Sequence, residues 1–219
     1  MKVNLNKGQK TRPLRLNMAS PVVGIVLAAG ESQRLGRPKA MVELGGRPLS
    51  WWAHHHLERA GCTSIVVVHP TIEQAVRALL PTATVVVNFE PERGRTGSLQ
   101  CGLQAAEKAL NSDRFRVLMA PVDRPGWNHE VVDRLLDGAA SVCPSSNGIR
   151  GHPVLLGDEA VHRVREAHPD EPLRNLVEFT PVDMEAPYLW LNIDTDDDVA
   201  GLLEREAALL IYFGQSEMI

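Results

Sequence analysis

Cysteine is scarce in this chain of 219 residues, which contains only three of them. Cys62, Cys101 and Cys143 stand far apart and form no Cys-x-x-Cys pair. This spacing argues against a disulfide framework and against a cysteine-based zinc site. The pattern is typical of buried thiols in a reducing compartment, so we expect a cytoplasmic protein.

Two further absences narrow the class of protein. No apolar stretch approaches the ~20 residues that a membrane span requires, so no membrane partner is expected. The net charge of -4 leaves no general excess of basic side chains. Nucleic acid is therefore not an expected partner, and any polyanion site must be a local cluster of basic groups.

The N-terminal 20 residues differ from the rest of the chain. They carry several lysines and arginines and no acidic residue, and they lack the apolar region of a secretory signal. We expect residues 1–20 to form a disordered basic arm. The remaining length fits one large α/β domain, which we expect to span residues 21–215.

Short apolar runs alternate with amphipathic stretches, which predicts a parallel sheet flanked by helices. Strands are expected at residues 22–26, 65–68, 84–87, 115–119, 140–143 and 150–156, and helices at 48–60, 72–80, 97–110, 129–138 and 196–212. Segments 91–96 and 144–151 are expected as loops after strands. Since ligands bind at the carboxyl ends of strands in open α/β sheets, these loops should surround one crevice.

The segment 27–39 is the most informative part of the sequence. It follows a β-branched apolar run and contains Gly30, Arg34, Gly36 and Lys39. Glycines lack a Cβ and let phosphate oxygens approach backbone N–H groups. An arginine can bind two phosphate oxygens at once, and a lysine supplies a point charge. The segment therefore predicts a loop that binds a polyanion.

Two common phosphate loops do not fit this segment. A Walker loop has four residues between its glycines, followed by Lys-Ser/Thr, whereas Gly30 and Gly36 enclose five and Lys39 precedes Ala40. The dinucleotide fingerprint Gly-x-Gly-x-x-Gly is absent, which disfavours a hydride-transfer enzyme. The pattern Leu-Ala-Ala-Gly-x-Ser-x-Arg-x-Gly-x-Pro-Lys instead resembles the signature loop of nucleotidyltransferases. Those enzymes join a nucleoside triphosphate to a phosphorylated acceptor and release pyrophosphate.

Two aspartates are candidate metal ligands. Asp123 follows an apolar strand, and Asn128 lies closer than Asp123 to the start of the next helix, which leaves Asp123 free of capping. Asp194 follows a short apolar run, and Thr195 can cap the helix behind it; a turn or capping role for Asp194 stays open. Since Mg²⁺ prefers oxygen ligands and takes one or two carboxylates, we expect a Mg²⁺ cofactor, with Mn²⁺ as the alternative.

From residue 22 to about 200 the chain resembles the molybdenum-cofactor nucleotidyltransferase group, nearest its cytidylyltransferase branch. Five boxes in the right order carry this resemblance. They are the loop at 27–39, Asn88 with residues 94–103 (Gly-Arg-Thr-Gly-Ser-Leu-Gln-Cys-Gly-Leu), residues 122–125 (Val-Asp-Arg-Pro), residues 148–154 (Gly-Ile-Arg-Gly-His-Pro-Val) and residues 192–195 (Asn-Ile-Asp-Thr). In the last box Asn192 stands where the group has an acid.

The resemblance implies a three-layer, Rossmann-like α/β fold of the GT-A-like type, with a mostly parallel sheet flanked by helices. It implies that Arg34, Lys39 and Asp123 are catalytic and that Asp123 and Asp194 bind the metal. The nucleotide site is expected at Leu27, Ala28, Ala29, Gly30, Ser32, Arg34, Gly36, Lys39, Asn88, Gly97, Ser98 and Gly102. The acceptor site is expected at Arg150, Gly151, His152 and Arg174.

The sequence specifies the two substrates less precisely than the type of reaction. In this group Leu-Ala-Ala-Gly accompanies CTP and Leu-Ala-Gly-Gly accompanies GTP, so Ala29 favours CTP, with GTP as the alternative. The acceptor is a small phosphorylated molecule. The Gly-Asp-x-Gly-Ala-Arg stretch of the cytidylyltransferase branch is missing, and segment 168–176 keeps only Arg174 in a comparable place. A molybdopterin, a sugar or polyol phosphate, and a nucleotide-binding regulator without catalysis all stay open.

Overall fold

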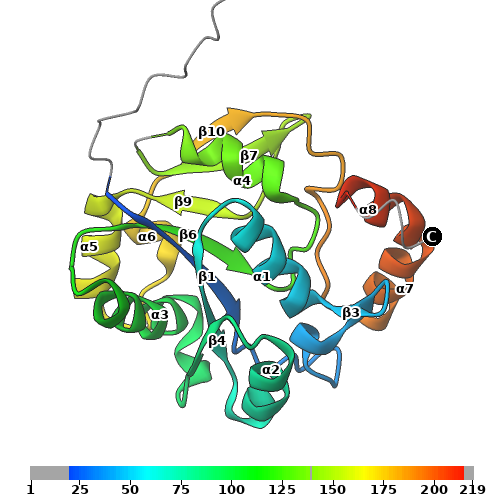
Figure 1. Cartoon of the computed structure of the whole chain (residues 1–219), viewed down its shortest axis with the longest axis horizontal. Coiled ribbons are helices and arrows are strands. Elements are labelled where there is room, and N and C mark those ends of the chain that lie inside the picture. The colour runs from blue at the N-terminus through cyan, green and yellow to red at the C-terminus, as the bar shows by residue number, and fades with distance from the viewer. Residues whose placement is uncertain (1–19, 139, 215–219) are drawn as a thin grey trace, which may run out of the picture.

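The computed structural model describes residues 20–138 and 140–214, and its centre is an eight-stranded sheet (Figure 1). The strand order is β10-β7-β9-β6-β1-β4-β5, with β8 paired to β7. The strands are β1 (Val22–Ala28), β4 (Thr63–Val68), β5 (Thr84–Val87), β6 (Arg116–Pro121), β7 (Val142–Ser146), β8 (Ile149–Arg150), β9 (Val154–Leu156) and β10 (Thr180–Asp183). β9 runs antiparallel to β6 and β7, β8 runs antiparallel to β7, and the other pairs are parallel. The expectation of a mostly parallel sheet is confirmed.

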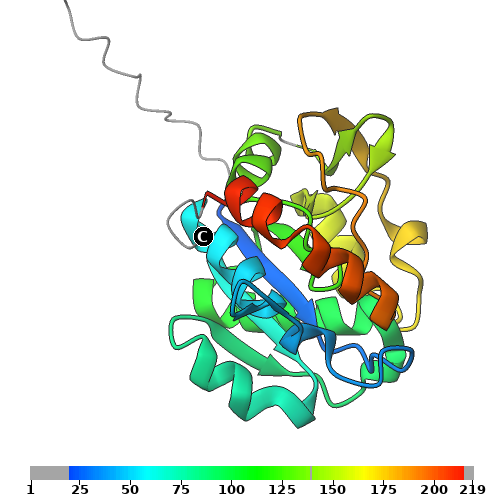
Figure 2. The same ribbon diagram turned by 90° about the vertical axis from the view of Figure 1, so that its right-hand side faces the viewer.

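Helices cover both faces of this sheet and make three layers. They are α1 (Leu49–Arg59), α2 (Glu73–Leu79), α3 (Gly94–Leu110), α4 (His129–Leu136), α5 (Asp158–Glu166), α6 (Leu173–Leu176), α7 (Asp196–Glu204) and α8 (Glu206–Tyr212). One hydrophobic cluster contains side chains of α1, α2, α4, α7 and α8, and the other contains those of α3, α5 and α6. The last two helices, orange to red, face the viewer in Figure 2.

The central strand β1 contributes to both clusters. Val26 and Ala28 point into the first cluster, whereas Ile25 and Leu27 point into the second. This alternation follows from the two-residue period of a strand, and it requires that both faces be apolar. Because β1 is buried on both faces, its sequence is continuously apolar instead of alternating between apolar and polar residues.

Some boundaries differ from the sequence expectations. Segment 91–96 is not a loop, because Pro91–Arg93 form a 3-10 helix and α3 begins at Gly94. The helix expected at 196–212 is two helices, interrupted at Arg205. Residues 1–19, 139 and 215–219 lie outside the described residues, and they include almost all of the predicted basic arm and the last residue of the predicted domain.

The segment 144–151 was expected as a loop, and this was wrong. β7 extends to Ser146 and turns back into β8, with Ser146 paired to Ile149. Asn147 and Gly148 make the turn with φ values of 52° and 79°. Consecutive residues with positive φ, most favourably Asn-Gly, are what a tight two-residue hairpin requires. The Asn-Gly pair was the available signal.

The single strand expected at 150–156 is also wrong. β8 ends at Arg150 and β9 begins only at Val154. A Cβ on Gly151 would lie 2.4 Å from Cγ of Leu189, so only glycine fits there, and Pro153 supplies no N–H for a strand ladder. The interruption turns His152 toward the side of the sheet where the candidate acceptor residues gather.

In the part of the chain that the structure describes, no helix combines the length and apolar character needed to cross a bilayer. The three cysteines are free thiols; Cys62 and Cys143 are buried and Cys101 is half-buried.

His56 is a fully buried histidine in α1, with none of its surface exposed. Its ring packs against Trp52, Trp127 and Phe213, with ring centroids 5.8, 5.4 and 4.7 Å away. Neither ring nitrogen has a hydrogen-bond partner among the described residues. A charge at this position would be both desolvated and unpaired, which is costly.

We expect replacement of His56 by leucine to flatten the acid dependence of stability. Burial lowers the pKa of His56 well below its ordinary value of 6.5, with smaller contributions from the charges of His55, His129 and Arg59. Below pH 6.5 the unfolded chain binds a proton that the folded chain resists. The free energy of unfolding of the unaltered protein should therefore fall by up to about 1.4 kcal/mol per pH unit below 6.5. Urea unfolding at pH 7 and pH 5 measures this, and parallel pH profiles for the two proteins would contradict it.

Candidate nucleotide and acceptor site

The glycine-rich loop after β1 is held by Ser32. The Ser32 carbonyl accepts hydrogen bonds from the N–H groups of Leu35 and Gly36, both at 3.0 Å. The Ser32 hydroxyl accepts a third from the N–H of Lys39 at 3.1 Å. Gly36 takes a φ of 69°, which favours glycine. These bonds fix the start of the 3-10 helix Lys39–Met41 at the carboxyl end of the sheet.

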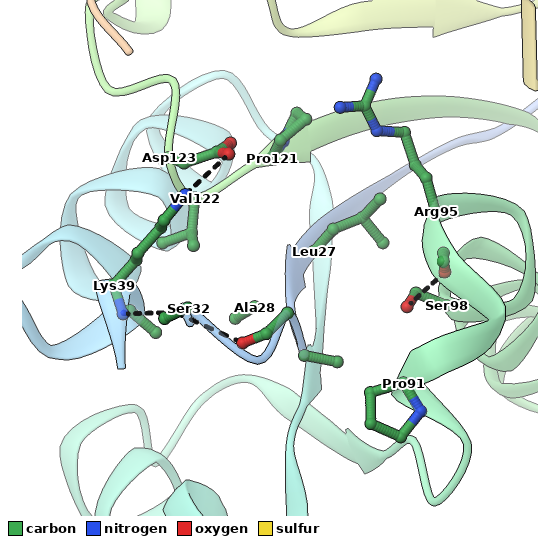
Figure 3. Close-up of a pocket in the computed structure, with 14 residues that line it drawn as sticks. Leu27, Ala28, Ser32, Lys39, Pro91, Arg95, Ser98, Pro121, Val122 and Asp123 are labelled. Carbon is green, nitrogen blue, oxygen red and sulfur yellow. Dashed lines mark hydrogen bonds and ion pairs between the residues drawn. The ribbon is translucent and has the colours of Figure 1, made fainter. Parts of the chain in front are cut away.

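Lys39 brings the two candidate metal ligands together. Its Nζ lies 2.5 Å from Oδ1 of Asp194 and 3.6 Å from Oδ2 of Asp123, and its side chain is only 14% exposed. Figure 3 shows Lys39 pointing to Asp123. Nη2 of Arg34 lies 3.0 Å from Oδ2 of Asp194. The N–H of Ile193 donates to the carbonyl of Asp123 at 2.9 Å, which ties the two carboxylate-bearing segments to each other.

Asp194 is held in place without capping a helix. Thr195 is the N-cap of α7 and forms a capping box with Asp198, as expected for Thr195. Nδ2 of Asn192 donates to Oδ2 of Asp194 at 2.7 Å. The hydrogen bond from Lys39, then that from Asn192 and the charges of Lys39 and Arg34 lower the pKa of Asp194 against the opposing effect of burial. Asn192, where the resembled group has an acid, thus supports an ionised Asp194 instead of repelling it.

The carboxylates suit a hard divalent cation. Asp123 and Asp194 both contact one ammonium group, so their oxygens can surround one small cation, and oxygen donors are what Mg²⁺ and Mn²⁺ prefer. Among residues 20–138 and 140–214, no group of three or more histidine, cysteine or acidic side chains is placed to hold a metal. The remaining ligands would be phosphate and water oxygens, which is usual for Mg²⁺ at nucleotide sites.

A cavity of about 250 Å³ opens beside this cluster (Figure 3). Its lining includes the predicted nucleotide residues Leu27, Ala28, Ala29, Gly30, Ser32, Lys39 and Ser98, together with the predicted catalytic residue Asp123. A second hollow of about 500 Å³, lined in part by Arg34, shares Ser32, Lys39 and Pro91 with the first. The loop and Asp123 therefore face two adjoining hollows.

A larger cavity of about 740 Å³ lies next to the first. Its lining includes all four predicted acceptor residues, Arg150, Gly151, His152 and Arg174. The floor is mixed, with Met119, Leu173 and Phe179 among its apolar residues. Burial, and after it the charges of Arg95 and Arg124, together lower the pKa of His152 to about 3. His152 is therefore a neutral group at the edge of a strongly basic space.

Five predicted nucleotide residues do not line the first cavity, and one of them, Arg34, lines the 500 Å³ hollow instead. A Cβ on Gly102 would lie 2.6 Å from Cγ2 of Ile25, so this glycine lets α3 pack closely on the sheet. Gly97 faces Pro169 and Arg93, and Gly36 shapes the loop. Asn88 is buried, and its Nδ2 donates to Oγ of Ser98 at 3.0 Å. Asn88 therefore orients a lining residue from behind.

Sequence reasoning missed two side chains. Asn192 was treated only as a departure, whereas it holds Asp194. Arg95, inside the second box, was given no role, yet it lines both the 250 Å³ and the 740 Å³ cavity. The available signal was a basic residue directly after Gly94 at the start of a helix.

Residues 24–185 match the family described as the MobA-like NTP transferase domain. The chain belongs to that family. This MobA-like protein is 35% identical over 148 residues to nicotine blue oxidoreductase of Paenarthrobacter nicotinovorans, a match that covers 62% of this chain and 70% of that protein. It is 39% identical over 108 residues to 2-C-methyl-D-erythritol 4-phosphate cytidylyltransferase of Rhodococcus opacus, covering 46% of this chain and 47% of the relative.

Solved structures share the fold of this MobA-like chain. The homologue of Mycobacterium tuberculosis Rv0371c from mycobacterium sp. strain JC1 superposes with a TM-score of 0.70 at 25% identity, covering 86% of this chain and 98% of that one. Mycobacterium tuberculosis Rv0371C in complex with manganese gives a TM-score of 0.63 at 23% identity, covering 84% and 98%. Family and fold together make this chain a nucleotidyltransferase of the α/β type.

Proposed function

We propose that this MobA-like protein is a Mg²⁺-dependent cytidylyltransferase that transfers CMP from CTP to a small phosphorylated acceptor, with a molybdopterin as the leading candidate. The observation that carries the proposal is the cluster of Lys39, Arg34, Asp123 and Asp194 beside the 250 Å³ cavity, which adjoins the larger cavity lined by the expected acceptor residues. Localisation in the cytoplasm is part of the same proposal.

The chemistry follows from where the charges lie. A phosphate oxygen of the acceptor forms a bond to the α-phosphorus of CTP, and the bond from that phosphorus to the α,β-bridging oxygen breaks. The electron pair leaves with pyrophosphate, whose charge Lys39 and Arg34 stabilise. Asp123 and Asp194 would hold the Mg²⁺, which when bound polarises the α-phosphate. Little covalent work remains for the protein, so positioning and electrostatics dominate.

Lys39 has two roles in this proposal. Its ammonium contacts and neutralises both carboxylates. Asp123 and Asp194 would hold Mg²⁺ with the same oxygens that contact the ammonium, and Lys39 would then turn to the phosphates of the nucleotide. The metal and the nucleotide are therefore expected to bind with positive coupling.

Support for cytosine comes from the Leu27–Gly30 stretch and from the cytidylyltransferase relative of Rhodococcus opacus. That relative is named for a polyol phosphate, which keeps a polyol-phosphate acceptor as the alternative to molybdopterin. The Paenarthrobacter relative is named as an oxidoreductase, and on this account a redox role is the second candidate function.

A thermal-shift panel tests the proposal without knowledge of the acceptor. CTP, GTP, UTP, ATP and NADPH are each added with and without Mg²⁺. A ligand at about 100 times its Kd stabilises a fold by about 2.7 kcal/mol, which is a shift of several degrees in a domain of this size. We expect a Mg²⁺-dependent shift with CTP alone.

The other outcomes are informative. A Mg²⁺-dependent shift with a different triphosphate would support nucleotidyl transfer and would contradict the assignment of cytosine as the base. A shift with NADPH only would favour the oxidoreductase. With CTP established, pyrophosphate release is measured with a molybdopterin, 2-C-methyl-D-erythritol 4-phosphate and a hexose 1-phosphate, and the acceptor that supports turnover decides between the acceptor classes.

A further inference from the structure

Arg95 stands between the two cavities. It lies in the first turn of α3, and among the described residues it is the only one that lines both the 250 Å³ and the 740 Å³ cavity. The cavity with Lys39 and Asp123 therefore meets the cavity with Arg150 and Arg174 at one guanidinium group.

The guanidinium of Arg95 also has no partner among the described residues. Within residues 20–138 and 140–214 its guanidinium forms no ion pair and no hydrogen bond, whereas Arg93, two residues earlier, pairs with Glu90 at 3.1 Å. The loop arginine Arg34 is likewise paired, with Asp194. Arg150 and Arg174, on the far side of Arg95, also form no ion pair with a described residue. Unpaired cations that face one cavity repel one another, so an anionic ligand would stabilise this arrangement.

The position of Arg95 relative to Lys39 suits an in-line displacement. Figure 3 shows Lys39 and Asp123 on one side of the cavity and the Arg95 guanidinium on the other, with Leu27 and Pro121 between them. In phosphoryl and nucleotidyl transfer the attacking and leaving oxygens lie on opposite sides of the phosphorus. If Lys39 is on the side of the leaving pyrophosphate, then Arg95 is on the side from which the acceptor attacks.

We propose that Arg95 binds the phosphate of the acceptor and holds its attacking oxygen against the α-phosphorus of the nucleotide. This inference rests on the proposed nucleotidyl transfer and adds to it the residue that joins the two substrates. A guanidinium can bind two oxygens of one phosphate and leave the third directed at the α-phosphorus. The acceptor phosphate attacks as a dianion, so this side needs no general base. His152, which lines the same cavity as Arg95, is neutral and adds no charge that would compete with Arg95 for the phosphate.

Inorganic phosphate is the probe, because it is the smallest form of the group that Arg95 would bind. The protein is saturated with Mg²⁺ and α,β-methylene-CTP, which cannot transfer its nucleotidyl group, and phosphate is titrated in by calorimetry. Arg95→Ala and Arg95→Lys are compared with Arg93→Ala, which removes a neighbouring arginine that lines neither cavity. All these side chains are exposed, so folding should be preserved, and circular dichroism checks this.

We expect Arg95→Ala to weaken phosphate binding by about 10- to 100-fold, which corresponds to a lost charge-assisted hydrogen bond. The phosphate affinity of Arg95→Lys should lie between that of the unaltered protein and that of Arg95→Ala, because lysine keeps the charge and loses the bidentate geometry. Arg93→Ala should match the unaltered protein, and the affinity for α,β-methylene-CTP should stay within about threefold in all variants. With CTP in place of the analogue, labelled phosphate should yield CDP and pyrophosphate, more slowly in Arg95→Ala.

Each contrary outcome has a separate meaning. Unchanged phosphate affinity in Arg95→Ala would overturn the role of Arg95. Absence of phosphate binding by the analogue-loaded unaltered protein would overturn it too, while leaving the nucleotide site intact. Failure of the unaltered protein to bind CTP or its analogue with Mg²⁺ would instead overturn the proposed function.

Discussion

Replacing Lys39 by alanine should lower kcat by roughly 10²- to 10⁴-fold, by analogy with the loss of a positioned donor at a site of developing charge. Lys39 is nearly buried, it is fixed by the Ser32 hydroxyl at its backbone, and its ammonium lies at the proposed metal position. The measurement is pyrophosphate release from CTP with whichever acceptor supports turnover in the unaltered protein.

A matched control separates catalysis from metal binding. Without the ammonium, Asp123 and Asp194 lose the cation that they share, and only Arg34 still pairs with Asp194. The affinity for Mn²⁺ in the absence of nucleotide should therefore stay the same or rise, as followed by electron paramagnetic resonance. Arg37→Ala removes an exposed cation of the same loop, paired with Asp196 at 2.8 Å, and should leave kcat within a factor of about three. Near-normal turnover in Lys39→Ala would contradict the role of Lys39.

Gly126→Ala should destabilise the fold by about 3 kcal/mol, which corresponds to a fall in Tm of roughly 6–12 °C for a chain of this length. A Cβ on Gly126 would lie 1.8 Å from the carbonyl oxygen of Tyr188, a backbone atom that cannot rotate away. That oxygen accepts a hydrogen bond from the N–H of Leu191 at 2.9 Å. The alanine would push apart the segments that carry Asp123 and Asp194, so metal affinity should fall together with Tm.

Gly201→Ala is the matched control for Gly126→Ala. Gly201 lies inside α7, where the nearest atom to an added Cβ is the end of the Arg205 side chain at 3.6 Å. A helical glycine replaced without a clash should leave Tm unchanged or raise it slightly. Equal Tm values for Gly126→Ala and the unaltered protein would show that the 121–127 segment can yield, which would contradict the close packing argued here.

Local patterns in the sequence predicted local structure well. The β-branched run of β1 predicted a buried strand, Thr195 was expected to cap the following helix, and both are confirmed. Where two local signals competed, the expectation was wrong. Pro144 and Gly151 favour the loop that was expected at 144–151, whereas Asn147-Gly148 favours the hairpin turn that the structure has.

The sequence by itself determined the mostly parallel α/β sheet and the family, because apolar periodicity and a glycine-rich loop after a strand are properties of short segments. It also predicted the phosphate-binding character of segment 27–39 and the candidate carboxylates Asp123 and Asp194. Only the tertiary structure decided that Lys39 lies between those carboxylates, that Asn192 holds Asp194, and that Arg95 is shared by two cavities. These contacts join residues far apart in the chain, and their distances depend on how β1, β6, α3 and the segment before α7 pack against one another. One sequence read locally contains no such distances.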